Sequence, residues 1–181
     1  MIYLKAFQTI LPSVVNCHLD VGTGVKFRFS DIVSAKHSLY NDVDPTLKFQ
    51  STPFLLCDSL LLSVYLKEKL FDLVTCFDVI EHLKKEDGYK LINELEKLSN
   101  NTVVFFTPLG EIAIGESKIK YEVHLSGWVP EDFKKLGYQC WVFPNFHKKF
   151  GYGAFFAIKS DNIVKKKLQC LDEIFAGEYW L

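Results

Sequence analysis

The residues of this sequence that offer chemistry include a group of acids and histidines. Asp78, Glu81 and His82 fall within the short run FDVIEHL, and His124 lies further along in HLSGW. If a helix begins near Asp78, residues 78, 81 and 82 share one of its faces. Carboxylates and imidazoles gathered in this way act as proton acceptors and donors, or hold a divalent ion.

Two interpretations of this acid–histidine group stay open. In the first, His82 or His124 is the general base for a hydroxyl acceptor, and Glu81 is a cap or a polar surface group. In the second, all four side chains ligate a metal ion, because two carboxylates and two imidazoles suit a divalent cation. For His124 there is also a plain structural alternative, a histidine bonded to a loop carbonyl.

Two glycines in the run CHLDVGTG form a second group. An apolar segment there leads into Asp20 and then into Gly22 and Gly24. Glycine is favoured where the backbone needs a positive φ or where another group lies too close for a side chain. A dinucleotide-binding fingerprint would continue to a third glycine, but Lys26 and Phe27 follow here. The pattern indicates a close approach to the backbone, and a tight turn is the alternative.

Predicted strands and helices alternate along the chain and must position these groups. Short apolar segments predict strands, and periodic apolar residues or capping patterns predict helices. The strands are expected at 17–21, 39–44, 54–58, 71–79 and 101–108, the helices at 31–38, 84–100 and 130–138, a late hairpin at 139–146 with 153–160, and a closing helix at 161–181.

This alternation favours right-handed crossovers and a mostly parallel sheet with helices on both faces, followed by a C-terminal antiparallel hairpin. The fold class is therefore α/β, with one domain over 1–181 whose core covers about 15–160. Ligands of such sheets bind beyond the carboxyl ends of the strands. The residues expected there are Asp20, Gly22, Gly24, Asp42, Asp44, Asp58, Asp78, Glu81, His82, Thr107 and Pro108.

Composition and charge exclude several classes of protein. The net charge of −1 over 181 residues argues against nucleic acid as a partner, because phosphate contacts need a basic surface. Five cysteines without a CxxC pair argue against a disulfide framework and for a reducing compartment. No apolar run approaches the roughly 18 residues of a membrane span, and MIYLKAFQTILPSVV lacks a leader pattern. The expectation is a cytoplasmic protein that does not bind membranes.

The ordered set of strand ends resembles the class I S-adenosylmethionine-dependent methyltransferases. The matching pieces are LDVGTG, NDVDP, LLCD, FDLVTCFDVIEHL and VVFFTP, followed by HLSGWVPEDFKKLGY, and they cover most of the chain. The specificity lies in their order and spacing. The resemblance implies a Rossmann-like domain, S-adenosylmethionine as cofactor, S-adenosylhomocysteine as product, and a small-molecule acceptor methylated at oxygen or nitrogen by direct in-line displacement.

The resemblance also implies roles for the residues at the first strand end. Gly22 and Gly24 would let backbone amides approach the carboxylate of the cofactor's methionine part. Asp20 would orient this loop or meet the amino group.

Further cofactor contacts are implied at the next strand ends. Asp44, with Asp42 as the alternative, would accept hydrogen bonds from both ribose hydroxyls, as one carboxylate can. Asp58 would bind the adenine amino group, and Phe77 and Asp78 would face the transferring methyl. For any one acid, a helix cap or a turn is the structural alternative.

The acid–histidine group is also similar to the metal site of the small-RNA 2'-O-methyltransferases, which carry Glu-x-x-Glu-His on this helix and His-x-x-x-Trp downstream. Here the first acid is Asp78, one methylene shorter than Glu. Many metal-free methyltransferases carry a similar Glu-His pair. The adopted expectation is therefore a site without metal, and a metal-assisted RNA methyltransferase is a further alternative.

Two departures from the family pattern lie on the cofactor side. Lys26 or Phe27 stands where a third small residue is usual. Only nine residues separate Asp44 from Phe54, fewer than a helical crossover usually needs. The alternative function is therefore a non-catalytic binding or scaffold protein on a degenerate methyltransferase fold. The aromatic tail EIFAGEYWL packs on its own domain or, alternatively, forms a homodimer contact.

Overall fold

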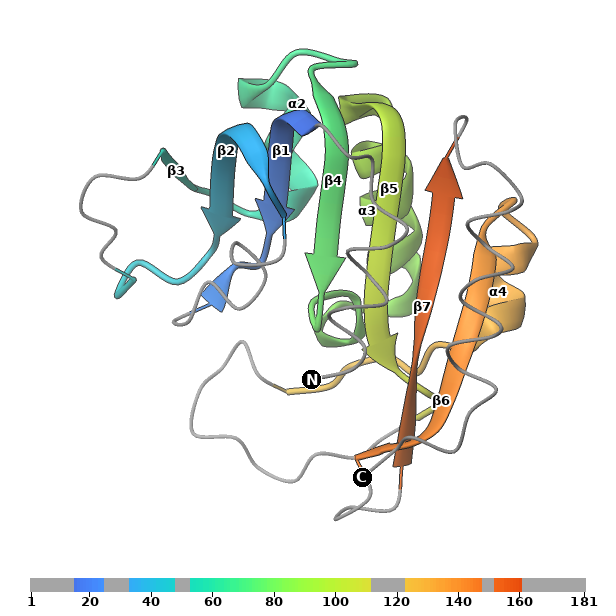
Figure 1. Ribbon diagram of the computed structural model, residues 1–181. Helices are drawn as coiled ribbons and strands as arrows, with labels where there is room; N and C mark the ends of the chain where they lie inside the picture. The colour runs from blue at the N-terminus through green and yellow to red at the C-terminus, as the bar shows by residue number, and fades with distance from the viewer. Residues whose placement is uncertain (1–14, 25–32, 48–52, 112–122, 148–151, 161–181) are drawn as a thin grey trace.

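The computed structural model describes residues 15–24, 33–47, 53–111, 123–147 and 152–160. These form a seven-stranded sheet in the order β3-β2-β1-β4-β5-β7-β6 (Figure 1). The strands are β1 Val15–Val21, β2 Ala35–Asp42, β3 Phe54–Leu56, β4 Phe71–Phe77, β5 Ser99–Pro108, β6 Gln139–His147 and β7 Tyr152–Ser160. Strands β1 to β5 run parallel, and β7 pairs antiparallel with both β5 and β6. This mostly parallel sheet with a C-terminal antiparallel pair confirms the predicted fold class.

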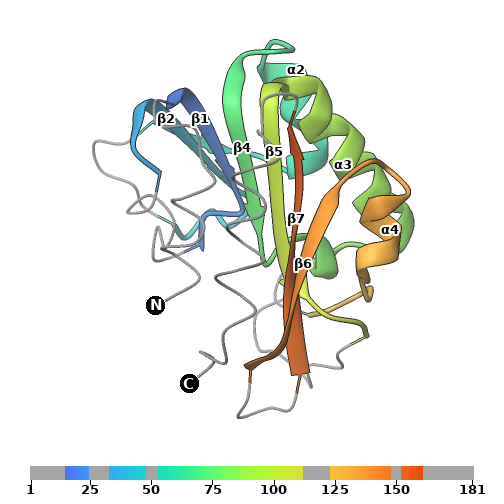
Figure 2. The ribbon, with the colours of Figure 1, turned by 45° about the vertical axis from the view of Figure 1, so that its right-hand side comes forward.

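The helices of the described residues lie along one face of the sheet (Figures 1 and 2), so the predicted helices on the other face stay a prediction. They are the short η2 Ser59–Leu61, α2 Leu62–Tyr65 and η3 Ile80–His82, the long α3 Lys85–Leu98, and α4 Pro130–Lys134. Helix α3 forms here because Leu91, Leu95 and Leu98 recur on one buried face. Helix α4 begins at Pro130, whose fixed φ and missing N–H suit a first helical position.

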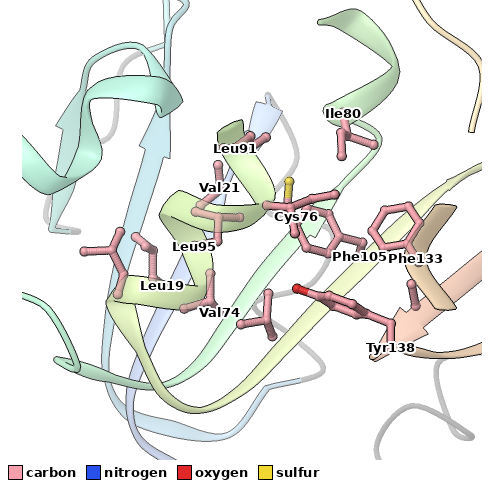
Figure 3. Close-up of a cluster of buried hydrophobic side chains, with 14 of the residues drawn as sticks. Leu19, Val21, Val74, Cys76, Ile80, Leu91, Leu95, Phe105, Phe133 and Tyr138 are labelled. Atoms are coloured by element: carbon pink, nitrogen blue, oxygen red, sulfur yellow. The ribbon is translucent and has the colours of Figure 1, made fainter. Parts of the chain in front are cut away.

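The hydrophobic core lies between these helices and the sheet (Figure 3). It joins Leu19 and Val21 of β1, Val74 and Cys76 of β4, Leu91 and Leu95 of α3, Phe105 of β5 and Phe133 of α4. The ring centroids of Phe105 and Phe133 are 5.2 Å apart. Since side chains alternate along a strand, the residues between these core positions project toward the opposite face of the sheet.

One predicted helix is wrong. Residues 35–38, expected in a helix over 31–38, belong to β2, which pairs parallel with β1 from Ala35 opposite Val15. Pairing with the buried strand β1 stabilises the extended conformation of these residues more than their weak helix propensity stabilises a helix. The shared helical face considered for residues 78, 81 and 82 does not form, because Asp78 has a φ of 53° and the short helix η3 begins only at Ile80.

Several predictions fall outside the described residues: the closing helix 161–181 with its tail EIFAGEYWL, the positions of Lys26 and Phe27, and most of the chain between β5 and HLSGW. The described sheet runs from Val15 to Ser160. The single domain over 1–181 stays a prediction. In the part of the chain that the structure describes, no helix has both the length and the apolar character needed to cross a membrane.

Candidate active site

Glycine is favoured at the two positions after β1 for different structural reasons. Gly22 and Gly24 have φ angles of 70° and 63°, in the left-handed region that favours glycine. A Cβ on Gly22 would collide with Cγ2 of Val79, whereas a Cβ on Gly24 would meet no atom of the described residues within 4 Å. The close neighbour of Gly22 is therefore the protein's own turn after β4, and the open space lies at Gly24.

The backbone amides of this glycine loop donate to β2. The amides of Gly22 and Thr23 donate to the carbonyl oxygen of Asn41, at 2.9 and 3.1 Å. The amide of Gly24 donates to Oδ2 of Asp42, at 2.8 Å. These bonds hold the loop against the end of β2. The implied contact of these amides with a cofactor carboxylate would require them to exchange partners.

The two acids near the end of β2 are bonded differently. Asp42 is the last residue of the strand, and its Oδ1 also accepts from the amides of Val43 and Asp44 at 2.7 and 3.0 Å. Asp44 accepts from the amide and hydroxyl of Thr46 at 2.8 and 2.7 Å, and the amide bond is the main cause that lowers the pKa of Asp44. The choice of Asp44 for the ribose stays a prediction, and Asp42 lies nearer to Gly24.

Asp58 and Phe77 have structural partners of their own. Oδ1 of the exposed Asp58 accepts from the amide of Leu60 at 2.9 Å and so caps η2, the alternative foreseen for an acid at a strand end. Phe77 is buried, with its ring centroid 6.2 Å from Phe106 and 5.8 Å from Phe156. The implied contacts of Asp58 with adenine and of Phe77 with the methyl stay predictions.

Asp20 is buried beneath the glycine loop in a polar network. Its Oδ1 accepts from the hydroxyl of Thr75 at 2.6 Å, and its Oδ2 accepts from the hydroxyl of Thr23 at 2.9 Å. Burial raises the pKa of Asp20 to about 6. Nε2 of His18 lies 2.8 Å from the same Thr75 hydroxyl, and burial lowers the pKa of His18 to about 4.

Sequence reasoning missed His18 and Thr75. The signal for His18 was its position two residues before Asp20, which places both side chains on one face of β1. Thr75 could be found only from the register of β1 against β4, where Asp20 pairs with Thr75.

The structure brings three of the four acid–histidine residues together. One ligand atom from each of Glu81, His82 and His124 lies within 4.8 Å of the others, and the two imidazole centroids are 4.9 Å apart. Asp78 is not part of this set. It is exposed and lies at the end of β4, where its left-handed backbone turns the chain.

Glu81 is the buried carboxyl of this group. Its Oε2 accepts from the hydroxyl of Thr107 at 3.0 Å, and its Oε1 is buried with no hydrogen-bond partner among the described residues. Burial, followed by the negative charge of Asp78, raises the pKa of Glu81 well above its usual range. A buried oxygen without a partner beside two imidazoles suits a proton or a cation as its occupant.

Main-chain bonds hold the segment 123–128 against η3. The amides of Leu125 and Ser126 donate to the carbonyl oxygen of Glu81, at 2.8 and 3.1 Å. Nδ1 of His82 donates to the carbonyl oxygen of Val123 at 3.2 Å, so Nε2 carries the lone pair when the ring is neutral. These bonds fix His124 beside the other two residues.

Trp128 anchors the end of the same segment. It is fully buried, and its Nε1 donates to Oγ of Ser126 at 2.9 Å. Nζ of Lys85 lies 3.6 Å from the centroid of the Trp128 ring and 2.7 Å from Oδ2 of Asp132. Sequence reasoning singled out the His-x-x-x-Trp spacing but missed Lys85, whose partners lie far along the chain.

Solved structures share this arrangement of strands. An S-adenosylmethionine-dependent methyltransferase from Archaeoglobus fulgidus is 14% identical, with a TM-score of 0.63 over 88% of this chain and 91% of that one. The N-methyltransferase NodS from Bradyrhizobium japonicum WM9 in complex with S-adenosylhomocysteine is 16% identical, with a TM-score of 0.60 over 87% and 84%. The fold is that of the class I methyltransferases.

A third structure of this fold is phosphoethanolamine N-methyltransferase 1 from Haemonchus contortus, in complex with phosphoethanolamine and S-adenosylhomocysteine. It is 12% identical, with a TM-score of 0.60 over 97% of this chain and 47% of that one. No family model matches the sequence. The search of curated proteins finds no match either.

In this methyltransferase fold the strand order reverses between β1 and β4, which is where α/β sheets bind ligands. The glycine loop follows β1, and the acid–histidine group follows β4. Val79, which contacts Gly22, lies between the end of β4 and η3, so the two groups are neighbours at this switch point.

Proposed function

We propose that this protein transfers the methyl group of S-adenosylmethionine to an oxygen or nitrogen of a small-molecule acceptor. The observation that carries the proposal is the acid–histidine group at the switch point of a methyltransferase fold. A small acceptor fits the net charge of −1, and two structures with this fold are N-methyltransferases.

The cofactor would lie across the ends of β1, β2 and β3. No atom of the described residues lies within 4 Å of a Cβ built on Gly24, so these residues leave room for a ligand against the backbone. Asp44, or Asp42 as the alternative, would accept the ribose hydroxyls, and Asp58 would meet the adenine amino group. The bound cofactor would supply an activated methyl group on a sulfonium, and S-adenosylhomocysteine would leave as the product.

The chain's own residues would position the acceptor and take its proton. An acceptor bound beyond β4 would meet His124 and His82, whose ligand atoms lie within 4.8 Å of each other, and either imidazole can accept a proton. The carboxyl of Glu81 next to them would stabilise the imidazolium that results. Displacement at a methyl group depends mainly on alignment, which the docked segment 123–128 supports by fixing His124.

Calorimetric titration with S-adenosylhomocysteine tests the cofactor. Binding in the micromolar range, about −8 kcal/mol, supports the enzyme and contradicts the scaffold alternative. A clean absence of binding to the folded protein refutes the proposed function and favours the non-catalytic protein.

The His124→Asn variant tests the role of the histidine. Formation of S-adenosylhomocysteine from S-adenosylmethionine, measured over a panel of small amines and hydroxy compounds, should fall on the order of a hundredfold. Affinity for S-adenosylhomocysteine should stay nearly unchanged. His37→Asn, at an exposed position of β2, is the matched control. If turnover survives, or if cofactor affinity falls instead, His124 is structural.

A bound divalent cation is the second candidate, favoured by the three ligand atoms within 4.8 Å and by the unpartnered Oε1 of Glu81. Two imidazoles and a carboxylate suit zinc or cobalt and leave a coordination position open. Co²⁺ titration with visible absorption should then show stoichiometric binding that is lost in His82→Asn. If the wild-type protein binds no Co²⁺, the metal site is refuted and the histidines keep the proposed role of general base.

A further inference from the structure

Four polar side chains form a continuous line beneath the glycine loop. His18 contacts Thr75, Thr75 contacts Asp20, and Asp20 contacts Thr23, with distances of 2.8, 2.6 and 2.9 Å between the polar atoms. The first three residues are buried. The line starts within the sheet and ends between Gly22 and Gly24, so it connects an interior histidine to the loop at the switch point.

The number of available hydroxyl and ring protons determines which group donates in each of these hydrogen bonds. Thr75 has one hydroxyl proton, and an ionised Asp20 can only accept. The hydroxyl therefore donates to Asp20, and Nε2 of His18 must donate to Thr75. Nδ1 of His18 then carries a lone pair, and it is the ring nitrogen that is buried without a hydrogen-bond partner in the part of the chain that the structure describes. The opposite direction would leave a buried N–H without an acceptor.

We propose that His18 is a positioning residue: its Nε2–H turns the hydroxyl of Thr75 toward Asp20 and so keeps Asp20 an ionised acceptor for the glycine loop. This rests on the proposed function, because the loop is the expected cofactor site. Without His18, Thr75 is free to donate to the carbonyl oxygen of Leu19, 3.4 Å away, and Asp20 loses its shortest hydrogen bond.

The surroundings make Asp20 the group that titrates near neutral pH. Burial is the largest effect and raises the pKa of Asp20, the hydrogen bonds from Thr75 and Thr23 lower it, and the negative charge of Asp42 at the end of β2 adds a smaller increase. The Cys76 thiol on β4 stays neutral, because burial raises its pKa well above the usual value. His18, with a pKa of about 4, is neutral where Asp20 ionises. Its contribution is thus a hydrogen-bond donor and not a charge.

Carboxyl ¹³C NMR of the cofactor-free protein tests this directly, with the Asp20 resonance identified by its loss in Asp20→Asn. His18→Leu removes the donor and should raise the Asp20 midpoint by about one unit. His18→Gln keeps an N–H donor and should stay close to wild type. An unchanged midpoint in His18→Leu, or an equal shift in both variants, overturns the proposal. If His18→Leu does not fold, Thr75→Val against Thr75→Ser makes the same comparison.

Calorimetry with S-adenosylhomocysteine from about pH 5 to 8 gives the functional readout. The affinity for S-adenosylhomocysteine should fall as Asp20 is protonated. In His18→Leu, the pH midpoint of this fall should move upward by the same amount as the NMR titration midpoint of Asp20. If S-adenosylhomocysteine binds but its pH dependence does not follow Asp20, the positioning role is refuted. If no form of the protein binds it, the proposed function fails, while the carboxyl titration still decides the role of His18.

Discussion

Replacing Gly22 with alanine puts a methyl group against Cγ2 of Val79, whereas the same change at Gly24 puts it into open space. Both residues have a positive φ, so each variant carries the cost of left-handed backbone, roughly 1–2 kcal/mol. Gly22→Ala adds overpacking, typically about 1–3 kcal/mol. The free energy of unfolding should therefore fall by about 2–5 kcal/mol in Gly22→Ala and by about 1–2 kcal/mol in Gly24→Ala.

Urea unfolding followed by tryptophan fluorescence measures this difference. Gly137→Ala is the matched control, because Gly137 has a φ of 87° and only the distant Cε of Lys159 within 4 Å. Calorimetry with S-adenosylhomocysteine should give the opposite order. Gly24→Ala should weaken binding by about tenfold or more, roughly 1.4 kcal/mol, because the methyl group occupies cofactor space. The folded fraction of Gly22→Ala should bind S-adenosylhomocysteine more tightly than Gly24→Ala does.

A double variant tests the cause of the Gly22 effect. Adding Val79→Ala to Gly22→Ala removes the methyl group that collides and should recover the overpacking share, a coupling of about 1–2 kcal/mol. The reasoning is refuted if Gly22→Ala is as mild as Gly24→Ala, or if Val79→Ala brings no recovery. Wild-type binding by Gly24→Ala would show that the open space does not hold the cofactor.

Three further outcomes are expected. Asp44→Ala should weaken S-adenosylhomocysteine binding by roughly 1.5–3 kcal/mol in calorimetry, more than Asp42→Ala. Asp42→Ala should mainly lower the free energy of unfolding, since three backbone amides lose their acceptor, and equal binding losses would exclude Asp44 as the ribose ligand. Lys85→Met removes the cation from the buried indole ring and should cost about 1 kcal/mol of stability in urea unfolding, while the exposed control Lys90→Met should cost almost nothing. Because the folded pKa of Asp20 is raised from 3.8 to about 6, its stabilising contribution is lost as pH rises through that range. The stability of Asp20→Asn relative to wild type should therefore rise by roughly 3 kcal/mol between about pH 4 and 6, and a flat difference would contradict the raised pKa.

The strand ends could be predicted from the sequence because their signals are local. An apolar run that stops at an acid or a glycine identifies the end of β1 or β4 without knowledge of its neighbours. The predicted helix over 31–38 failed for the opposite reason, since residues 35–38 become a strand only through their pairing with β1.

The polar contacts needed information that the sequence does not carry in any one segment. The bond between Asp20 and Thr75 depends on the register of two strands far apart in the chain. The bond from Thr107 to Glu81 likewise depends on how far β5 extends beside η3. The meeting of His124 with His82 was a hypothesis that came from the resemblance to the metal site of the small-RNA 2'-O-methyltransferases. The main-chain hydrogen bonds to Glu81 and the Lys85 cation over Trp128, which hold His124 in place, were not predicted from the sequence.

The way Glu81 holds the segment 123–128 has a consequence for how this site can diversify. The docking bonds end on the main-chain oxygen of residue 81, while its side chain points to Thr107 and the two histidines. A different side chain at this position would change the proton or ion affinity of the group without releasing the segment that carries His124. The docking of the segment thus depends on the main chain of residue 81, whereas the chemistry of the acid–histidine group depends on its side chain.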